Sequence, residues 1–294
     1  MKKIVAIDIG GTFIKHRVVR EDGKVIKYNK SSTNKSNIEE FINTLINIVN
    51  EYKKKEDIIG VSISIPGFVN NKIGIVNNCT AFRFIEGYKL KENLESLLNI
   101  PVLIENDANC VALAEKFTGN AKECEDFICI TIGTGIGGGI FLNGDLVRGK
   151  EFKGGEFCYM ITKDEDGYMT LSENSSFTAL SRMYCDYKRG GKENIILGET
   201  IFEEAKVDEN INKIIEKWYG NIGRMVYNLS SILNPEKILI GGGISSRVDF
   251  LKKLEFQLNK IPKWNFIKCN IELCKHKNNA GIIGAAYNFF NLKL

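Results

Sequence analysis

Short apolar runs alternate with longer amphipathic segments along most of this chain, which is the pattern of an α/β protein. The apolar runs predict strands over residues 3–8, 13–19, 25–28, 58–65, 102–105 and 237–240. The amphipathic segments predict helices over residues 36–54, 90–98, 108–116, 173–187, 200–206, 209–233 and 279–291. Ser36 or Asn37 can cap the first helix, and Gly119 is expected to end the third.

Two strands run into glycine-rich turns, and each turn contains a threonine. The first turn is Asp-Ile-Gly-Gly-Thr at residues 8–12, and the second is Gly-Thr-Gly-Ile-Gly-Gly-Gly at residues 133–139. Glycine allows positive φ and lets backbone N–H groups approach an anion, whereas glycine inside a strand lowers its stability. A single turn of this kind is more often a plain hairpin, but two of them favour a polyphosphate held between two domains.

The segment 127–142 repeats the strand–turn–strand pattern of residues 4–19, which indicates an internal duplication. Neither turn contains the Gly-Lys-Ser/Thr of a P-loop. In both turns the glycines lead into a strand, whereas the glycines of a dinucleotide-binding fingerprint lead into a helix. The two turns therefore predict a phosphate site of another kind.

The composition is that of a globular protein and excludes several classes of function. The 294 residues are 44% hydrophobic and 26% charged, enough for a large core and two domains. A net charge of +4, from 40 basic and 36 acidic residues, is too small to indicate a nucleic-acid surface. We expect no signal peptide, and no apolar run approaches the ~20 residues of a membrane span. These features predict a cytoplasmic protein that binds neither nucleic acid nor membrane.

Eight cysteines and two histidines limit the metal chemistry that the chain can support. No two cysteines have Cys-x-x-Cys spacing, and two histidines cannot form a multi-histidine site. Most of the cysteines lie in apolar stretches, as reduced and buried thiols do. We therefore expect the chemistry to depend on carboxylates.

Polar side chains crowd the point where the strand over 102–105 gives way to a helix, in the run Glu-Asn-Asp-Ala-Asn at 105–109. N-capping of the helix would explain one of these side chains. The carboxyl end of a strand is also where α/β proteins bind their ligands. We interpret Asp107 as a general base for a substrate hydroxyl, and Asn106 as the residue that orients this hydroxyl.

Two later segments place small residues beside candidate contacts. Glu156 follows Gly154 and Gly155, which favour close approach to a ligand, and Glu173 on the next helix is a further candidate. In the last helix the run Ala-Gly-Ile-Ile-Gly-Ala-Ala at 280–286 presents a small face. This face suits either close helix packing or the plane of an adenosine, and the sequence leaves both interpretations open.

Six motifs in a fixed order make this chain similar to one known family. They are Asp-Ile-Gly-Gly-Thr at 8–12, Pro-Gly at 66–67, Glu-Asn-Asp-Ala-Asn at 105–109, Gly-Thr-Gly-Ile-Gly-Gly-Gly at 133–139, Gly-Gly-Glu at 154–156 and Gly-Gly-Gly at 241–243. In this order they resemble the ROK family (repressors, open reading frames and sugar kinases), and the resemblance covers essentially the whole chain. No single motif is decisive, whereas the six together are very specific.

The resemblance implies an α/β fold of two domains like that of actin and hexokinase (ribonuclease H-like), with ATP and a sugar in the interdomain cleft. It implies a smaller domain over 1–117, a larger domain over 118–278, and a C-terminal helix over 279–294 that returns to the smaller domain. The family likeness also suggests a homodimer, although nothing in the sequence identifies its interface.

The resemblance further implies roles for individual residues. By this likeness Asp8 would hold Mg²⁺ through water, and Asp107 would be the base. The residues implied to line the phosphates are Gly10, Gly11, Thr12, Thr134 and Gly135. The residues implied to border the adenosine are Gly241, Gly242 and Gly243. The residues implied to contact the sugar are Gly67, Asn106, Asp107, Glu156 and Glu173.

The chain departs from the family pattern after residue 156. ROK kinases usually carry a histidine three residues after the Gly-Glu glutamate, where this chain has Tyr159, which either contacts the sugar through its phenol or packs. They then carry a cysteine-rich zinc loop, whereas residues 161–171 contain no cysteine or histidine. We therefore expect no structural zinc, and a local hydrophobic cluster in its place. The spacing to Glu173 also differs slightly from that of the family's second sugar glutamate.

These features predict ATP-dependent phosphorylation of a hexose or hexosamine at its 6-hydroxyl. N-acetylmannosamine is the expected sugar, because zinc-free loops with tyrosine occur among some N-acetylmannosamine kinases and β-glucoside kinases of the family. A β-glucoside or glucose is the alternative. A sugar-binding sensor or repressor without kinase activity is the alternative from another class. The position of Asp8 leaves no room for the helix-turn-helix domain of a repressor, and the presence of both Asp8 and Asp107 argues against a sensor.

Overall fold

The computed structural model describes residues 1–164, 167–191 and 195–291. Contacts divide the chain into two compact units. Unit 1 comprises Met1–Glu123, Gly139–Gly154 and Asn278–Leu294, and unit 2 comprises Cys124–Gly138 and Gly155–Lys277. The domain boundaries expected from the sequence, at residues 117 and 278, stay a prediction.

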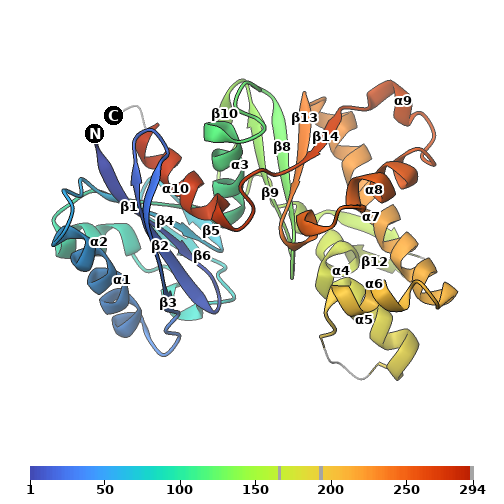
Figure 1. The fold of residues 1–294 in the computed structure, drawn as a ribbon, viewed down its shortest axis with the longest axis horizontal. Coiled ribbons are helices and arrows are strands. Elements are labelled where there is room, and N and C mark those ends of the chain that lie inside the picture. The colour runs from blue at the N-terminus through green and yellow to red at the C-terminus, as the bar shows by residue number, and fades with distance from the viewer. Residues whose placement is uncertain (165–166, 192–194, 292–294) are drawn as a thin grey trace. The chain divides into compact units, whose positions relative to one another are not determined.

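Unit 1 is built on a five-stranded sheet with the order β3-β2-β1-β4-β7 (Figure 1). Its strands are β1 (Lys3–Ile9), β2 (Phe13–Arg20), β3 (Val25–Ser32), β4 (Val61–Ile65) and β7 (Val102–Asn106). The first three strands are antiparallel neighbours, whereas β4 runs parallel to β1 and β7 runs parallel to β4. All five strands were expected from the sequence, and β4 begins at Val61 rather than at residue 58.

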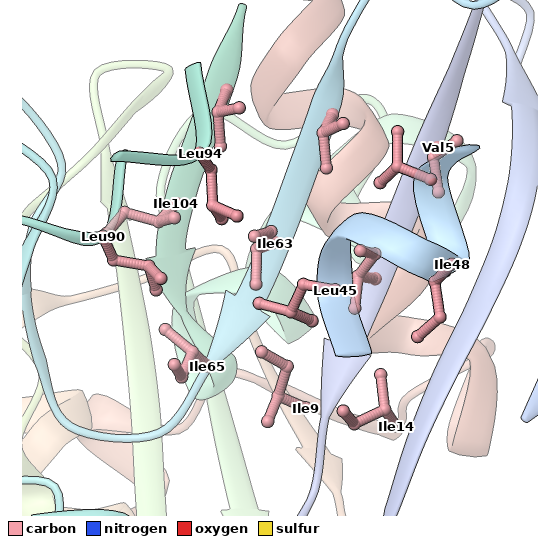
Figure 2. Packing of buried hydrophobic residues seen from close by; sticks show 14 of the residues in the cluster. Val5, Ile9, Ile14, Leu45, Ile48, Ile63, Ile65, Leu90, Leu94 and Ile104 are labelled. Carbon is pink, nitrogen blue, oxygen red and sulfur yellow. The ribbon is translucent and has the colours of Figure 1, made fainter. Parts of the chain in front are cut away.

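Two apolar clusters lie on the two faces of this sheet, because successive side chains of a strand point to opposite faces. The helices of unit 1 are α1 (Ile38–Lys53), α2 (Leu90–Leu98), α3 (Asp107–Thr118) and α10 (Ala280–Phe290). Leu45 of α1 and Leu94 of α2 belong to the cluster that contains Val5 of β1 (Figure 2). Ile282 of α10 belongs to the cluster that contains Ile4 of the same strand. The sheet is therefore buried on both faces.

The small residues of α10 let this helix lie directly against α3 and β1. A Cβ atom at Gly284 would lie 1.8 Å from the carbonyl oxygen of Cys110, and one at Gly281 would lie 2.3 Å from Oδ1 of Asp8. Neither position can accept a side chain unless the backbone or the Asp8 carboxylate moves. The small face at 280–286 therefore serves close packing, which decides between the two interpretations that the sequence left open.

We expect Gly284→Ala to destabilise the protein by about 1–3 kcal/mol, because the added methyl group must push α10 away from the backbone of α3. Gly220→Ala is the matched control, since Gly220 is also helical and its Cβ would meet only Oε1 of Gln257, at 3.9 Å. This control should be neutral or slightly stabilising, because alanine favours helix more than glycine does. Urea unfolding measures both effects, and equal midpoints for the two variants would contradict the packing argument.

A second five-stranded sheet has the order β10-β9-β8-β13-β14 (Figure 1). Its strands are β8 (Phe127–Ile132), β9 (Ile136–Leu142), β10 (Asp145–Leu146), β13 (Lys237–Gly241) and β14 (Asn270–Leu273). The chain passes from unit 2 to unit 1 within β9, between Gly138 and Gly139. The strand order repeats that of the first sheet position by position, and β13 is parallel to β8 as β4 is to β1. This repetition confirms the internal duplication that the sequence predicts.

The described helices of unit 2 include one break that the sequence did not predict. They are α4 (Leu171–Ser175), α5 (Phe177–Arg189), α6 (Gly198–Glu204), α7 (Glu209–Leu233), α8 (Phe250–Leu258) and α9 (Trp264–Ile267). The single helix expected over 173–187 is wrong, because Ser176 is extended, with φ −75° and ψ 170°, and its side chain caps α5. The helix expected over 209–233 is confirmed with the same bounds.

The segment after Tyr159 forms a hairpin rather than the expected hydrophobic cluster. Strands β11 (Ile161–Asp164) and β12 (Gly167–Thr170) pair antiparallel, and Ile161 and Tyr168 are 61% and 80% exposed. Residues 165 and 166 lie outside the described part. The expectation was wrong because most residues here are polar, so backbone pairing organises the segment.

Shorter elements are β5 (Phe68–Asn70), β6 (Ile75–Asn77) and the 3-10 helices η1 (Arg83–Ile85), η2 (Phe157–Tyr159), η3 (Gly243–Ser246) and η4 (Lys277–Asn279). The antiparallel pair of β5 and β6 follows Gly67 directly. Within the described ranges, no helix combines the length and the apolarity that a bilayer crossing requires.

Candidate active site

In unit 1 the polar residues gather at the carboxyl ends of the parallel strands. The strand register pairs Asp8 of β1 with Ser64 of β4, and Ser64 with Glu105 of β7. Ser64 Oγ donates a hydrogen bond to Oδ1 of Asp8 at 2.9 Å, and Lys15 Nζ forms an ion pair with Oδ2 of Asp8 at 3.2 Å. This edge is where α/β proteins bind ligands, so the sheet itself brings the predicted phosphate and sugar residues together.

Asn106 joins the end of β7 to two other backbone segments. Its Oδ1 accepts the backbone N–H of Asn109 at 2.9 Å, which makes it the N-cap of α3, and its Nδ2 donates to the Gly67 carbonyl at 3.0 Å. The cap is the structural role that the sequence offered as an alternative. The Asn106 side chain also hydrogen-bonds Asp107. Its amide oxygen keeps a second lone pair, so Asn106 can cap the helix and still accept a hydrogen bond from a hydroxyl.

Asp107 is the first residue of α3, and its Oδ1 accepts the N–H of Ala108 at 2.9 Å. The side chain is accessible to solvent, yet the protein atoms crowded around its carboxylate raise its pKa, and the negative charge of Asp8 raises it further. The charge of Asp8 therefore acts on the Asp107 carboxylate within unit 1. A raised pKa makes Asp107 a stronger base for a hydroxyl proton than an ordinary aspartate.

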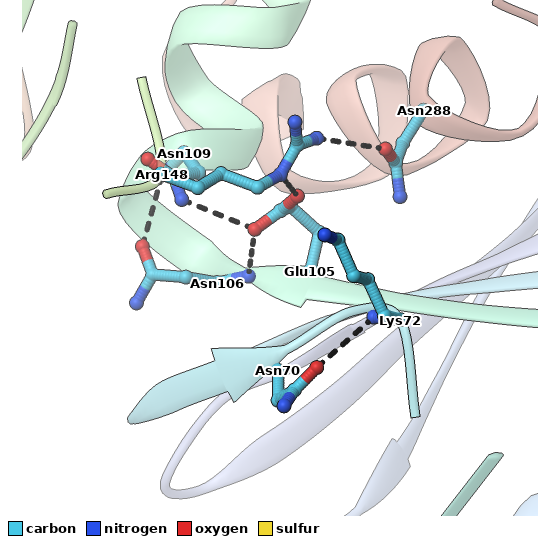
Figure 3. Close-up of polar contacts among 7 residues, drawn as sticks. All are labelled: Asn70, Lys72, Glu105, Asn106, Asn109, Arg148 and Asn288. Carbon is cyan, nitrogen blue, oxygen red and sulfur yellow. Dashed lines mark hydrogen bonds and ion pairs between the residues drawn. The ribbon is translucent and has the colours of Figure 1, made fainter. Parts of the chain in front are cut away.

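An ion pair between the buried Glu105 and the partly exposed Arg148 holds the turn between β7 and α3 (Figure 3). The fully buried Glu105 accepts from Arg148 Nε at 2.8 Å, from Asn109 Nδ2 at 3.1 Å and from the backbone N–H of Asn106 at 3.0 Å. Arg148 also donates to Asn288 of α10 at 3.4 Å. This network fixes the backbone from which Asn106 and Asp107 project.

Sequence reasoning missed Ser64, Lys15 and Arg148. Lys15 pairs with Asp8 across the β1–β2 turn, so the hairpin register alone could have located it. Glu105 ends an apolar strand, and such a buried carboxylate requires a positively charged partner. Nothing along the chain indicates that the partner is Arg148.

In unit 2 the second glycine turn is anchored on the first residues of α5. The Gly133 carbonyl accepts the N–H of Phe177 at 2.9 Å, and the Thr134 carbonyl accepts the hydroxyl of Thr178 at 2.8 Å. The first bond uses the backbone N–H of Phe177 at the start of α5, which an uninterrupted helix would bond internally, and the second uses the side-chain hydroxyl of Thr178. The break at Ser176 therefore positions the turn.

Thr134 and Gly243 line one pocket of about 290 Å³, although they are far apart in sequence. The other residues that line it are Phe177, Thr178, Ile195, Ile196, Leu197, Gly198, Glu199, Phe202, Ser246 and Arg247. The Arg247 guanidinium lies 3.7 Å from the centre of the Phe202 ring. Gly241 and Gly242 lead from β13 into η3 at this pocket. Apolar walls with a few polar groups suit a flat aromatic base.

Three further candidates also lie in unit 2. Glu156 is half-buried and accepts from the Cys158 thiol at 3.4 Å, and burial together with the Glu156 charge raises the pKa of Cys158 to about 12. Tyr159 is 55% exposed. Glu173 forms a capping box with Thr170, whose hydroxyl and backbone N–H donate at 2.7 and 2.8 Å. The Glu173 carboxylate thus has a structural role, and the roles of all three residues toward a sugar stay predictions.

The donors of unit 1 fit a magnesium ion that is bound mainly by other ligands. In the described part of the chain, no group of three or more His, Cys, Asp or Glu residues lies together. Mg²⁺ keeps several waters and is commonly held by one or two carboxylates plus substrate phosphates. The single carboxylate of Asp8, beside the open glycine turn, matches that donor set.

The chain is similar to known sugar kinases over nearly its whole length. The model of the ROK family matches residues 4–290. A β-glucoside kinase of Listeria monocytogenes is 39% identical over 292 residues, which cover 98% of this chain and 97% of that protein. An N-acetylmannosamine kinase of Haemophilus influenzae is 26% identical over 300 residues, which cover 97% and 94% of the two chains.

Solved structures share the fold over nearly the full length. The Lmo2764 protein of Listeria monocytogenes is 38% identical with a TM-score of 0.89, and the match covers 99% of this chain and 100% of that one. A ROK family glucokinase of Streptomyces griseus, in complex with glucose and AMPPNP, is 25% identical with a TM-score of 0.79 and coverage of 97% and 98%.

Proposed function

Because this chain belongs to the ROK family and is a sugar kinase with the actin/hexokinase-like fold, we propose that it transfers the γ-phosphoryl group of ATP to the 6-hydroxyl of a β-glucoside. The kinase chemistry is carried by one observation. Asp107, an accessible carboxylate of raised pKa, lies at the same strand edge as Asp8. A β-glucoside is proposed as the acceptor because the β-glucoside kinase of Listeria monocytogenes is 39% identical, whereas the N-acetylmannosamine kinase of Haemophilus influenzae is 26% identical. The 38% identical Lmo2764 protein is instead proposed to be an N-acetylmannosamine kinase, so this sugar is the second candidate.

Asp107 accepts the proton of the sugar 6-hydroxyl while the oxygen of this hydroxyl attacks the γ-phosphorus. ADP leaves with the electrons of the broken P–O bond. The second lone pair of the Asn106 amide oxygen accepts a hydrogen bond from a sugar hydroxyl and orients it, and Gly67 allows its backbone to approach the ring. Phosphoryl transfer needs alignment and charge neutralisation more than covalent help, so a positioned base and fixed hydrogen bonds supply what the protein must contribute.

In this proposal Asp8 would hold Mg²⁺ through water, and the ion would neutralise part of the phosphate charge. Gly10, Gly11 and Thr12 form the turn between β1 and β2, where Gly11 and Thr12 are exposed and can present backbone N–H groups to phosphate oxygens. The Lys15 ammonium, now paired with Asp8, adds a positive charge on the same side. No structural zinc enters the proposal.

The residues of unit 2 contribute nucleotide and sugar contacts in this proposal. Thr134 and Gly135 bind the phosphates of ATP, and Gly241, Gly242 and Gly243 border its adenosine. The apolar pocket that Thr134 shares with Gly243 supports this assignment, because its walls suit an adenine ring. We further propose that Glu156, Tyr159 and Glu173 contact sugar hydroxyls, and that the protein is a homodimer.

The acceptor is tested by measuring ADP release with ATP, Mg²⁺ and a panel of sugars. We expect methyl β-D-glucoside and β-linked disaccharides to give the highest kcat/KM. N-acetylmannosamine, the sugar expected from the sequence, is the second candidate, because the Haemophilus influenzae kinase of that name matches 97% of this chain. A kcat/KM for N-acetylmannosamine tenfold above that of every β-glucoside would overturn our choice of acceptor. Sugar binding without ADP release would instead contradict the kinase activity.

A further inference from the structure

Besides the unit 2 pocket described above, unit 1 contains a pocket that no step of the proposed reaction uses. It lies over the β5–β6 hairpin and the loop at residues 150–153, and it has a volume of about 410 Å³. Side chains that line it include Phe68, Asn70, Asn77, Asn78, Phe152 and Lys153. Pockets for small molecules typically measure roughly 300–1,000 Å³, so this pocket can hold a ligand.

The pocket adjoins the residues to which we assign the sugar. Phe68 directly follows Gly67, and the Gly67 carbonyl accepts the Asn106 side chain at 3.0 Å. One lining residue of the pocket, Phe68, is therefore the sequence neighbour of a proposed sugar contact. It lies on β5, which contacts β7. We therefore infer that a group attached to a sugar bound at Asn106 and Asp107 can reach this pocket.

The charges of the pocket are paired or balanced. Lys153 Nζ forms an ion pair with Glu151 at 2.9 Å and lies 5.6 Å from the centre of the Phe68 ring. Glu86 accepts the backbone N–H of Asn78 at 3.0 Å. The lining thus contains two lysines, Lys150 and Lys153, and two glutamates, Glu86 and Glu151. Such a lining favours a neutral ligand over a phosphate or a carboxylate.

The uncharged side chains suit a sugar ring in particular. Phe68 and Phe152 are half-buried and offer apolar surface to C–H groups. The Asn70 oxygen accepts the backbone N–H groups of Lys72 and Ile73, so its amide can donate to hydroxyls. The Asn77 amide can both donate and accept. Phe152 has φ +59°, an uncommon conformation for a bulky residue. The turn that holds Phe152 is closed by a backbone hydrogen bond from Gly154 to Arg148, at 2.9 Å.

We propose that this pocket binds the second sugar ring of a β-linked disaccharide whose first ring occupies the site at Asn106 and Asp107. The inference rests on the proposed function, since it assumes that a β-glucoside is the acceptor. The second ring is the group attached at C1 of the phosphorylated glucose. The pocket thus selects β-linked disaccharides over glucosides with a small substituent.

The test compares two β-glucosides that differ only in this second ring, methyl β-D-glucoside and cellobiose. Phe152→Ala and Asn77→Ala should each raise the KM for cellobiose roughly tenfold, because each removes a contact to the second ring. The kinetics with methyl β-D-glucoside should stay within about twofold. Phe266→Ala is the matched control, since Phe266 is an exposed phenylalanine of unit 2 far from the pocket in sequence. ADP release gives the rates, and mass spectrometry locates the phosphate on the first ring.

The outcomes separate the two proposals. A selective loss with cellobiose in both variants supports the pocket. If wild type phosphorylates both glucosides and the variants change neither KM, or change both equally, the pocket assignment is wrong while the kinase proposal stands. If wild type phosphorylates neither glucoside but phosphorylates another sugar, the β-glucoside proposal fails and the pocket assignment fails with it.

Discussion

Replacing Asp107 by asparagine should lower kcat for sugar phosphorylation by about 10²–10⁴-fold, the usual contribution of a general base. Asparagine keeps an oxygen that can accept the N–H of Ala108, so the start of α3 should survive, but it cannot take the hydroxyl proton. Nucleotide affinity should stay close to that of the wild type, because Asp107 is assigned to the sugar. Steady-state ADP release and nucleotide titration together measure these two effects.

Asp57→Asn is the control for this experiment, since it removes an exposed carboxylate of unit 1 that has no assigned role. Its rate should equal that of the wild type. Asp107→Ala should be as inactive as the asparagine variant, because the missing property is basicity. A rate near that of the wild type in either Asp107 variant would remove this residue from the mechanism.

The raised pKa of Asp107 sets the direction of the pH dependence. Only the ionised carboxylate can accept the hydroxyl proton, so the rate should fall as the pH is lowered through the pKa of Asp107. Because crowding by protein atoms and the charge of Asp8 both raise that pKa, the fall should begin at a higher pH than an ordinary aspartate would give. A pH profile of kcat/KM that stays flat down to the ordinary aspartate range would contradict this role.

Removing Arg148 should destabilise the protein by about 1–3 kcal/mol, less than the loss of one partner of a fully buried ion pair, because Glu105 is buried whereas the Arg148 side chain is 27% exposed. Arg148→Ala leaves the Glu105 carboxylate buried with only neutral donors, from Asn106 and Asn109. The turn that carries Asn106 and Asp107 should loosen as well, so the sugar KM should rise. Urea unfolding measures the change in stability, and ADP release measures the change in KM.

Two comparisons make this prediction specific. Lys153→Ala breaks an exposed pair with Glu151 and should cost less than about 1 kcal/mol. The double variant Arg148→Ala with Glu105→Gln should recover part of the lost stability, because it removes the unpaired charge. If Arg148→Ala and Lys153→Ala unfold at the same urea concentration, Glu105 does not depend on Arg148.

The sequence alone determined the secondary structure of most of the chain and predicted several residues of the candidate site. Apolar periodicity placed β1, α1, α7 and α10 to within a few residues, because strand and helix periods are local properties. The six ordered motifs identified the family, because each is a short run whose chemistry is visible without a fold. Asp8, Asn106 and Asp107 were found in this way, and the sheet register then brought them to one edge.

Only the tertiary structure decided which distant residues meet. It selected Arg148 as the partner of Glu105, assigned the small face of α10 to packing on Cys110, and broke the helix at Ser176 where the Gly133 turn binds. A pattern along the chain records how each residue relates to its neighbours in sequence. Contacts between segments that are far apart in sequence depend on how the sheets order those segments, so no local pattern contains them.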